Sequence, residues 1–293
     1  PRTFEGSYVP VTLRLENDGA RAPSLMLVED EFPPGDRWRL RKLLTEPVPR
    51  TRRFEINFTG HCNHRRNLYS LGPVRFEAWD PLGLARKRLF VGEVSHLLVY
   101  PAAVDLTMTQ LLGQGTLAHV GVDTAKRVGY SAEFVGVRPY RIGDSPSTVH
   151  WKSSARKGEL IVREFQEDLT TEVTFFIDLS RMGLTGIGDQ TSMEYAIKAT
   201  ASLAKRAVER SHAVAMYAIG TETEYIPPGR GRNHLLMVLD RLALLRAEGG
   251  RGFLQHVQRY VPYLHPGGTA VIVTSATTLD LEAARLCIRL LND

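Results

Sequence analysis

The C-terminal part of the sequence alternates short, continuously apolar runs with longer helical patterns, and this alternation constrains the fold more than any other feature. The apolar runs are Val173–Ile177, Ala213–Ile219 and Thr269–Thr274. Runs of this length without polar alternation are typical of strands buried on both faces of a sheet. The helical patterns cover Ser192–Glu209, Leu235–Leu245, Phe253–Leu264 and Leu281–Leu290. The alternation predicts a doubly wound, Rossmann-like α/β domain over residues 171–293. Thr223–Ile226 is expected to fold back on the second strand as a hairpin, ended by Pro227 and Pro228.

Residues 1–104 carry a different signal, because apolar and polar residues alternate there with a period of two. The stretches predicted to be strands are Val9–Leu15, Leu25–Asp30, Phe54–Phe58, Val74–Ala78 and Leu97–Tyr100. Short strands separated by turn residues favour a small β-sandwich. We therefore expect an all-β domain over residues 1–104, followed by a connecting and signature segment over 105–170. Residues 105–137 within it are poorly periodic and are interpreted as a connection.

The segment from Arg138 to Glu164 is dense in aromatic residues and in charges of both signs. Residues 148–157 are predicted to form a short helix, which Ser145 or Ser147 would cap. Gly158 would end the helix in a left-handed conformation. Residues 159–166 are then predicted to form a strand.

Trp151 and Ala155 are four residues apart and share one face of this helix, so we expect Trp151 to anchor the helix to the rest of the domain. Two interpretations of the segment stay open. It is either a solvated helix–strand unit with local ion pairs or a docking surface for a protein partner. The residues of the docking surface would be Arg138, Tyr140, Asp144, His150, Trp151, Lys152, Arg156 and Arg163.

The net charge of the chain is +5, and most of the excess lies in residues 1–104, where 16 Lys and Arg stand against 12 Asp and Glu. Such an excess could face an anionic membrane surface or nucleic acid. No basic stripe with aromatic platforms accompanies it, so we expect no nucleic-acid partner. The two cysteines, Cys62 and Cys287, argue against a disulfide framework.

Several motifs together resemble a known family. They are R-P-Y-R-x-G-D from Arg138, H-W-K-S-S-A-R-K-G-E-L-I-V-R-E-F from His150, T-F-F-I-D-L-S from Thr174, Y-S-L-G-P-V-R-F from Tyr69 and D-P-L-G-L from Asp80. They resemble the bacterial family called domain of unknown function 58. Its members are von Willebrand factor A-like proteins that are often associated with MoxR-type AAA+ ATPases. The resemblance covers most of the chain.

This resemblance implies a β domain followed by a von Willebrand factor A-like α/β domain. It also implies membrane helices upstream of the region, which fits a chain that starts at Pro1 rather than at Met. The protein would then be attached to the membrane through segments missing from this chain and would lie on the cytoplasmic face of the cell membrane. The implied partner is a MoxR-type AAA+ ATPase, for which the protein would act as an adaptor.

Von Willebrand factor A domains often hold Mg²⁺ through Asp-x-Ser-x-Ser after the first strand, together with a Thr and an Asp from later loops. Here Asp178 and Ser180 match, whereas Met182 replaces the second Ser and a thioether is a poor Mg²⁺ ligand. The later loop, residues 274–276, brings no carboxylate. The alternative is that Asp178 and Ser180 satisfy backbone amides at the end of the strand.

Three functional hypotheses follow. The leading one is a non-enzymatic, membrane-associated interaction protein. The second is an adhesion-type domain that binds its ligand through a divalent cation, although neither Thr185 nor Thr191 can be assigned as the missing ligand. The third is a hydrolase that uses Asp144 and His150, which the absence of a nucleophile motif disfavours.

Overall fold

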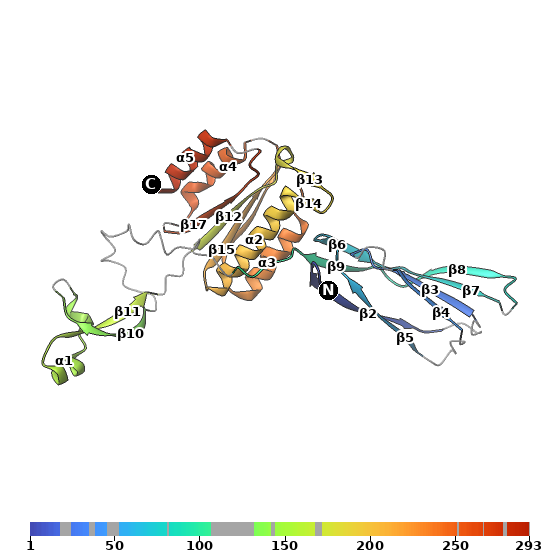
Figure 1. Cartoon of the computed structure of the whole chain (residues 1–293), viewed down its shortest axis with the longest axis horizontal. Helices are drawn as coiled ribbons and strands as arrows, with labels where there is room; N and C mark the ends of the chain where they lie inside the picture. The colour runs from blue at the N-terminus through green and yellow to red at the C-terminus, as the bar shows by residue number, and fades with distance from the viewer. Residues whose placement is uncertain are drawn as a thin grey trace. The chain divides into compact units, whose positions relative to one another are not determined.

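The three-dimensional structure is a computed structural model that describes residues 1–17, 25–34, 39–45, 53–80, 82–106, 132–141, 144–167, 172–250, 252–265, 267–277 and 280–292. The side chains of residues 39–41, 132–136, 163–167 and 292 lie outside this description. The chain divides into two compact units, shown in Figure 1. Unit 1 comprises Pro1–Met108 and Glu172–Asp293, and unit 2 comprises Thr109–Thr171.

The first part of unit 1 is strand-rich. Its strands are β1 (Arg2–Phe4), β2 (Tyr8–Leu15), β3 (Leu25–Glu31), β4 (Arg39–Leu44), β5 (Phe54–His61), β6 (Asn67–Leu71), β7 (Val74–Trp79), β8 (Arg86–Val91) and β9 (Ser95–Tyr100). In the described part of the chain they form sheets with the strand orders β1-β9-β6, β2-β5 and β4-β3-β7-β8. The predicted stretches correspond to β2, β3, β5, β7 and β9, so the expectation of a strand-rich N-terminal region is confirmed.

Apolar side chains on the inner face of the β2–β5 pair hold these sheets together. One cluster joins Val28, Leu44 and Ile56, which come from β3, β4 and β5. A second cluster joins Cys62, directly after β5, with Leu97 of β9. Each fully buried aliphatic side chain of this kind stabilises the fold by roughly 1.5–3 kcal/mol.

The second part of unit 1 is a mixed α/β region. Its main strands are β12 (Glu172–Asp178), β15 (Ala213–Ile219), β16 (Thr223–Gly229) and β17 (Thr269–Val273), in the order β16-β15-β12-β17. β12 is parallel to β15 and β17, whereas β16 is antiparallel to β15. The helices are α2 (Ser192–Glu209), α3 (Gly231–Leu244), α4 (Phe253–Tyr260) and α5 (Leu281–Asn292). Helices α2 and α3 cover one face of the sheet, and α4 and α5 cover the other (Figure 1).

The apolar strands explain this layering. Phe176 of β12 and Tyr217 of β15 stack at 5.1 Å between ring centroids and belong to one buried cluster with Val257 of α4 and Cys287 of α5. Phe175, which alternates to the opposite face of the sheet, is also fully buried. The strands are therefore covered on both faces, as their continuous apolar sequences predict.

Two expectations for this sheet are wrong in detail. β16 does not end before Pro227 and Pro228 but continues to Gly229. The register with β15 shifts between Val214 and Met216, and neither proline has a paired residue, so their missing amides break no ladder bond. β17 is half-buried rather than buried along its length, because it is the outer strand of the described sheet.

A buried arginine joins the two parts of unit 1. Arg66 Nη2 donates to Glu194 Oε1 of α2 at 3.1 Å, and the two side chains are only 5% and 6% exposed. Arg66 Nη1 donates to the carbonyls of Leu242 (2.9 Å) and Ala243 (3.0 Å) at the end of α3. A planar guanidinium suits both tasks, because it carries several donors and its positive charge complements a helix C-terminus.

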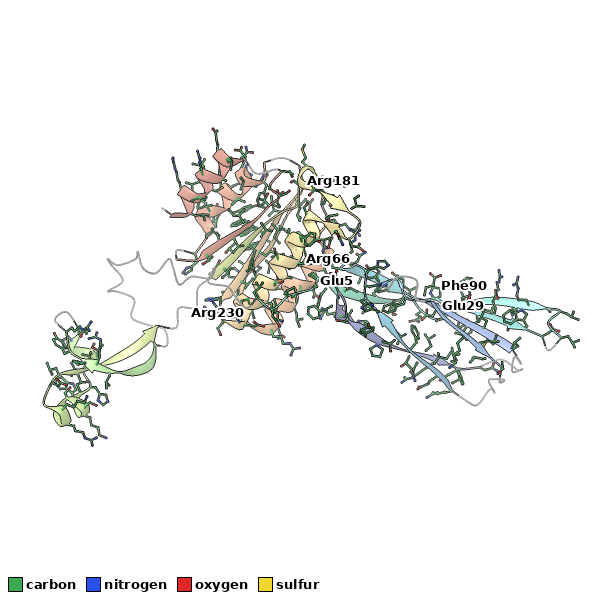
Figure 2. All side chains as sticks on the ribbon, viewed as in Figure 1. Glu5, Glu29, Arg66, Phe90, Arg181 and Arg230 are labelled. Atoms are coloured by element: carbon green, nitrogen blue, oxygen red, sulfur yellow. The ribbon has the colours of Figure 1, made fainter. Side chains whose placement is uncertain are left out.

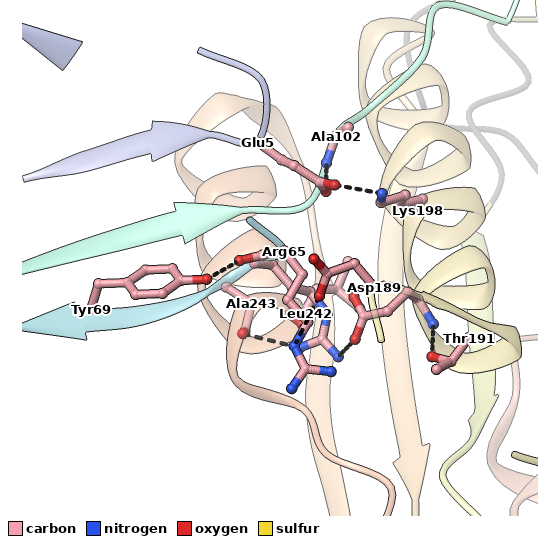
Figure 3. A network of polar contacts seen from close by, with 11 residues as sticks. Glu5, Arg65, Tyr69, Ala102, Asp189, Thr191, Lys198, Leu242 and Ala243 are labelled. Atoms are coloured by element: carbon pink, nitrogen blue, oxygen red, sulfur yellow. Dashed lines mark hydrogen bonds and ion pairs between the residues drawn. The ribbon is translucent and has the colours of Figure 1, made fainter. Parts of the chain in front are cut away.

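Further polar contacts surround this arginine. Lys198 of α2 pairs with Glu5 at 2.6 Å, and the Tyr100 hydroxyl donates to Asp240 of α3 at 2.6 Å. Figure 3 shows part of this network from close by, with Glu5 facing Lys198. Polar contacts thus join the strand-rich part and the α/β part of unit 1, and the Arg66–Glu194 pair is the buried one among them.

Unit 2 is built on an antiparallel pair of strands, β10 (Ala132–Pro139) and β11 (Ile161–Glu167), with helix α1 (Trp151–Lys157) between them in sequence. The interpretation of residues 105–137 as a connection is wrong at its end, because β10 begins at Ala132 and pairs with β11. Residues 107–131 lie outside the described part. Backbone hydrogen bonds to β11 stabilise β10 as a strand, and the weakly periodic sequence of β10 does not indicate them.

Candidate functional site

A bidentate ion pair organises the turn before α1. Arg138 donates from its two terminal nitrogens to Asp144 at 2.7 and 2.8 Å, and the amide of Arg141 donates to the same carboxylate at 2.8 Å. The hydrogen bonds from Arg138, followed by the one from the Arg141 amide, lower the pKa of Asp144 to about 2. Asp144 is therefore a permanently charged structural group near neutral pH, and its contacts tie it to Arg138 rather than to His150.

The start of α1 is capped by a residue that the sequence did not single out as a cap. His150 accepts from the amide of Ser153 at its Nδ1 (3.2 Å), whereas neither Ser145 nor Ser147 caps α1. Capping through Nδ1 requires that nitrogen to be unprotonated. The end of the helix is as predicted, because Gly158 is left-handed with φ = 73°.

Ser154, and not Trp151, attaches α1 to the strand beside it. The Ser154 hydroxyl oxygen is buried and accepts from the amide of Ile161 at 2.9 Å. Ile161 and Val162 are also buried at the start of β11. Trp151 is 67% exposed, so the expectation that it anchors the helix is wrong. It does share a face with Ala155, but that face is turned to solvent because Ser154 occupies the inner side of this seven-residue helix.

The candidate docking residues therefore fall into three groups. Trp151, Lys152, Ala155 and Arg156 are exposed on one side of α1, which we call the α1 outer face. Arg138, Asp144 and His150 form the frame that fixes α1, and Tyr140 is exposed beside the turn. Arg163 pairs with Val137 in the β10–β11 ladder, and its side chain lies outside the described part.

The second candidate site lies at the carboxyl end of β12. Asp178 accepts from the amide of Ser180 at one oxygen (2.9 Å) and from the Thr274 hydroxyl at the other (2.7 Å). The first contact is the amide-satisfying role that the sequence allowed as an alternative. Thr191, considered as a possible ligand, accepts from the amide of Glu194 and caps α2.

A cavity of about 480 Å³ opens beside Asp178. Its lining includes Ser180, Met182 and Asp280. Asp280 accepts from the amides of Glu282 (2.9 Å) and Ala283 (3.2 Å) at the start of α5. Within the described ranges there is no group of three or more His, Cys, Asp or Glu residues that could hold a metal ion. A carboxylate with both oxygens engaged and a thioether in the same wall are a poor donor set for Mg²⁺.

Thr274 of the second site and the buried Arg66 of unit 1 were not identified from the sequence. Thr274 was noted only for the carboxylate that its loop lacks. It comes directly after β17, Asp178 is the last residue of the parallel strand β12, and parallel neighbours end at one edge of a sheet. Once the two strands were assigned, the position of Thr274 next to Asp178 could have been predicted. Arg66 carries no local signal, because its partners are more than a hundred residues away in sequence.

No helix in the described part of the chain is both long enough and apolar enough to cross a membrane.

Comparison with known proteins finds a similarity to a bacterial protein. It is 24% identical over 175 residues to the uncharacterized protein YeaD of Bacillus subtilis (strain 168), an alignment that covers 60% of this chain and 42% of that protein. The chain therefore spans less than half of the length of this relative. No solved structure matches the chain. The family model described as protein of unknown function DUF58 matches residues 136–283, from β10 to α5, and the chain belongs to this family.

Proposed function

We propose that this protein is a non-enzymatic adaptor that binds a protein partner through the α1 outer face. The observation that carries the proposal is Trp151, a large aromatic side chain left 67% exposed on a helix whose two ends are fixed. Trp and Arg are the residues most enriched at the energetic centres of protein interfaces. Lys152 and Arg156 are four residues apart and share the exposed side of α1 with Trp151.

The frame beneath α1 makes this face suitable for binding. The Arg138–Asp144 pair, the His150 cap and the buried Ser154 hydroxyl fix the helix before any partner arrives. A preorganised surface loses less conformational entropy on association. A complementary partner would offer an apolar pocket for the indole, flanked by carboxylates for the two cationic side chains.

The partner class that fits the family resemblance is a MoxR-type AAA+ ATPase, and the α/β region would be a von Willebrand factor A-like domain. The parallel β15-β12-β17 arrangement, with Asp178 and Ser180 at its carboxyl end, supports that fold assignment. Attachment at the cytoplasmic face of the membrane, through segments outside this chain, is part of the same proposal and rests on the resemblance alone.

Binding of the purified chain to a MoxR-type ATPase from the source organism, measured with ATP, with ADP and without nucleotide, tests the proposal. We expect nucleotide-dependent binding that Trp151→Ala weakens at least tenfold, since removal of a central interface aromatic costs about 2 kcal/mol or more. Arg156→Glu should weaken it as well. The matched control is Tyr263→Ala, which removes an aromatic side chain that is 78% exposed in unit 1.

The variants are also expected to keep the circular dichroism spectrum and melting temperature of the unaltered chain, because both side chains are exposed. Wild-type affinity in Trp151→Ala and Arg156→Glu, or equal loss in Tyr263→Ala, would remove the α1 outer face from the interface. The cation-dependent hypothesis has less support, because the oxygens of Asp178 are already engaged by Ser180 and Thr274.

A further inference from the structure

The hairpin between β7 and β8 exposes several large apolar side chains. Leu82 and Leu84, in the turn between the strands, are 78% and 84% exposed. The turn is held in shape by Asp80, whose carboxylate accepts from the amides of Leu82 (3.4 Å) and Ala85 (2.7 Å). Two leucines are thus presented at the tip of the hairpin, and nothing in the described part of the chain covers them.

Basic residues follow the tip directly. Arg86, Lys87 and Arg88 begin β8, and residues 82–92 contain no acidic residue. Arg88 is paired with Glu77 on the neighbouring strand, whereas Arg86 and Lys87 have no ion-pair partner within the described ranges. β8 is also the outer strand of its sheet, and the strand is exposed along its whole length (Figure 1; Phe90 is labelled in Figure 2).

Protection of an edge strand explains only part of this pattern. Charged residues on an outer strand prevent pairing with other chains, which would account for Arg86 to Arg88. It does not account for the two leucines, since exposed leucines at the tip of a hairpin favour association. From its tip, the hairpin presents first leucines and then basic residues. An anionic bilayer has the matching order from its interior outward, with apolar acyl chains first and negatively charged headgroups next.

The dimensions of the hairpin agree with that order. Strands rise about 3.3 Å per residue, so Arg86 lies roughly 7 Å from Leu84, which matches the depth of about 5–10 Å reached by interfacial apolar groups. Trp79 pairs directly with Arg86 across the two strands. Tryptophan favours the headgroup level of a membrane, where its ring is half in apolar surroundings.

We propose that the tip of the β7–β8 hairpin inserts into the surface of an anionic lipid bilayer, with Leu82 and Leu84 below the headgroups and Arg86 and Lys87 among them. This membrane contact is separate from the α1 outer face, since it uses unit 1 and no residue of the docking proposal.

Co-sedimentation of the whole chain with vesicles tests the inference. One vesicle type is phosphatidylcholine alone, and the other contains phosphatidylglycerol as well. We expect binding to the anionic vesicles only, and weaker binding as salt is added. Leu82→Glu with Leu84→Glu should reduce it at least tenfold, and Arg86→Glu with Lys87→Glu should do the same, since each basic residue near such a surface contributes about fivefold.

Two controls make the test specific. Ile187→Glu changes an apolar residue that is 92% exposed at the tip of another hairpin and should bind as the unaltered chain does. Phe90→Glu, on the same strand but roughly 13 Å beyond Arg86, should also leave binding unchanged if the hairpin enters end-on. All variants lie at exposed positions, and their melting temperatures report whether the fold is kept.

Several outcomes would overturn the inference. They are no binding to anionic vesicles, equal binding to both vesicle types, and tip variants that bind as strongly as Ile187→Glu. Loss of binding in Phe90→Glu would replace end-on insertion by a contact along β8. If light scattering shows that the chain self-associates and that the tip variants abolish this, a second copy and not a bilayer covers the leucines.

Discussion

Replacement of Arg66 by methionine tests whether the two parts of unit 1 depend on one buried charge pair. Methionine keeps most of the side-chain volume but removes the donors to Glu194, Leu242 and Ala243. The Glu194 carboxylate, 6% exposed, would be left without its cationic partner. Breaking a buried pair by removing one partner destabilises proteins by about 3–5 kcal/mol, and we expect a loss of this size.

The second variant, Arg66→Met with Glu194→Met, separates the charge from the packing. With both charges gone, most of the cost should disappear, because apolar replacement of a buried ion pair is often neutral. The carbonyls of Leu242 and Ala243 still lose their donor, so about 1–2 kcal/mol should remain. Glu194→Met alone leaves Arg66 unpaired and should also cost about 3–5 kcal/mol, so the double-mutant cycle should give a coupling energy of at least about 4 kcal/mol.

Urea unfolding followed by circular dichroism measures these differences, with Arg14→Met as the matched control. Arg14 and Glu55 form an ion pair at 2.9 Å, but their side chains are 73% and 48% exposed. Such a pair contributes at most about 1 kcal/mol. The reasoning fails if Arg66→Met is no more destabilising than Arg14→Met, or if the coupling energy between Arg66 and Glu194 is zero.

Three further predictions concern other parts of the chain. Because the pKa of Asp144 falls from 3.8 to about 2 on pairing with Arg138, the ion pair should stabilise unit 2 fully above pH 3.8 and lose its effect as the pH falls toward 2. Hydrogen exchange around α1 should report this transition, and Asp144→Asn should abolish it. Gly186→Ala should lower the stability of unit 1 by at least about 1 kcal/mol in thermal unfolding. The reason is that φ of Gly186 is +98° and the added carbon would lie 2.0 Å from a backbone carbonyl oxygen. The carbon added in Gly188→Ala would meet no atom within 4 Å, so that variant should cost less. Mg²⁺ should not raise the melting temperature in a manner that depends on Asp178, and a shift that Asp178→Ala removes would contradict our interpretation of that carboxylate.

The elements of this protein were predictable where burial dominates. The strand over Ala213–Ile219 and the helix over Ser192–Glu209 have the predicted bounds, because their residues are buried on the faces that the apolar pattern indicates. β10 was missed, since its strand character comes from pairing with β11 rather than from its own periodicity. Sequence pattern therefore succeeds when an element's own residues form the core, and fails when a neighbour supplies the stabilising bonds.

The candidate site was less predictable, because a shared helix face does not say which way that face points. Trp151 and Ala155 do lie together, but the inner position of α1 belongs to Ser154, whose hydroxyl closes a backbone bond to Ile161. In a helix of seven residues, one such polar contact decides the orientation, while apolar area would decide it in a longer one. Because Trp151 faces solvent rather than the rest of its domain, it is a better candidate for binding a partner than the sequence indicated.

The buried Arg66 has a consequence for how the protein is made. It is 128 residues ahead of Glu194 in the chain, and Glu5 is 193 residues ahead of Lys198. At a synthesis rate of about 5–20 residues per second, Arg66 is polymerised roughly 6–25 s before Glu194. Through that interval the strand-rich part holds Arg66 without the carboxylate that later pairs with it. Arg66 remains hydrated until the α/β region has been synthesised, so the two parts of unit 1 dock late in the synthesis and folding of the chain.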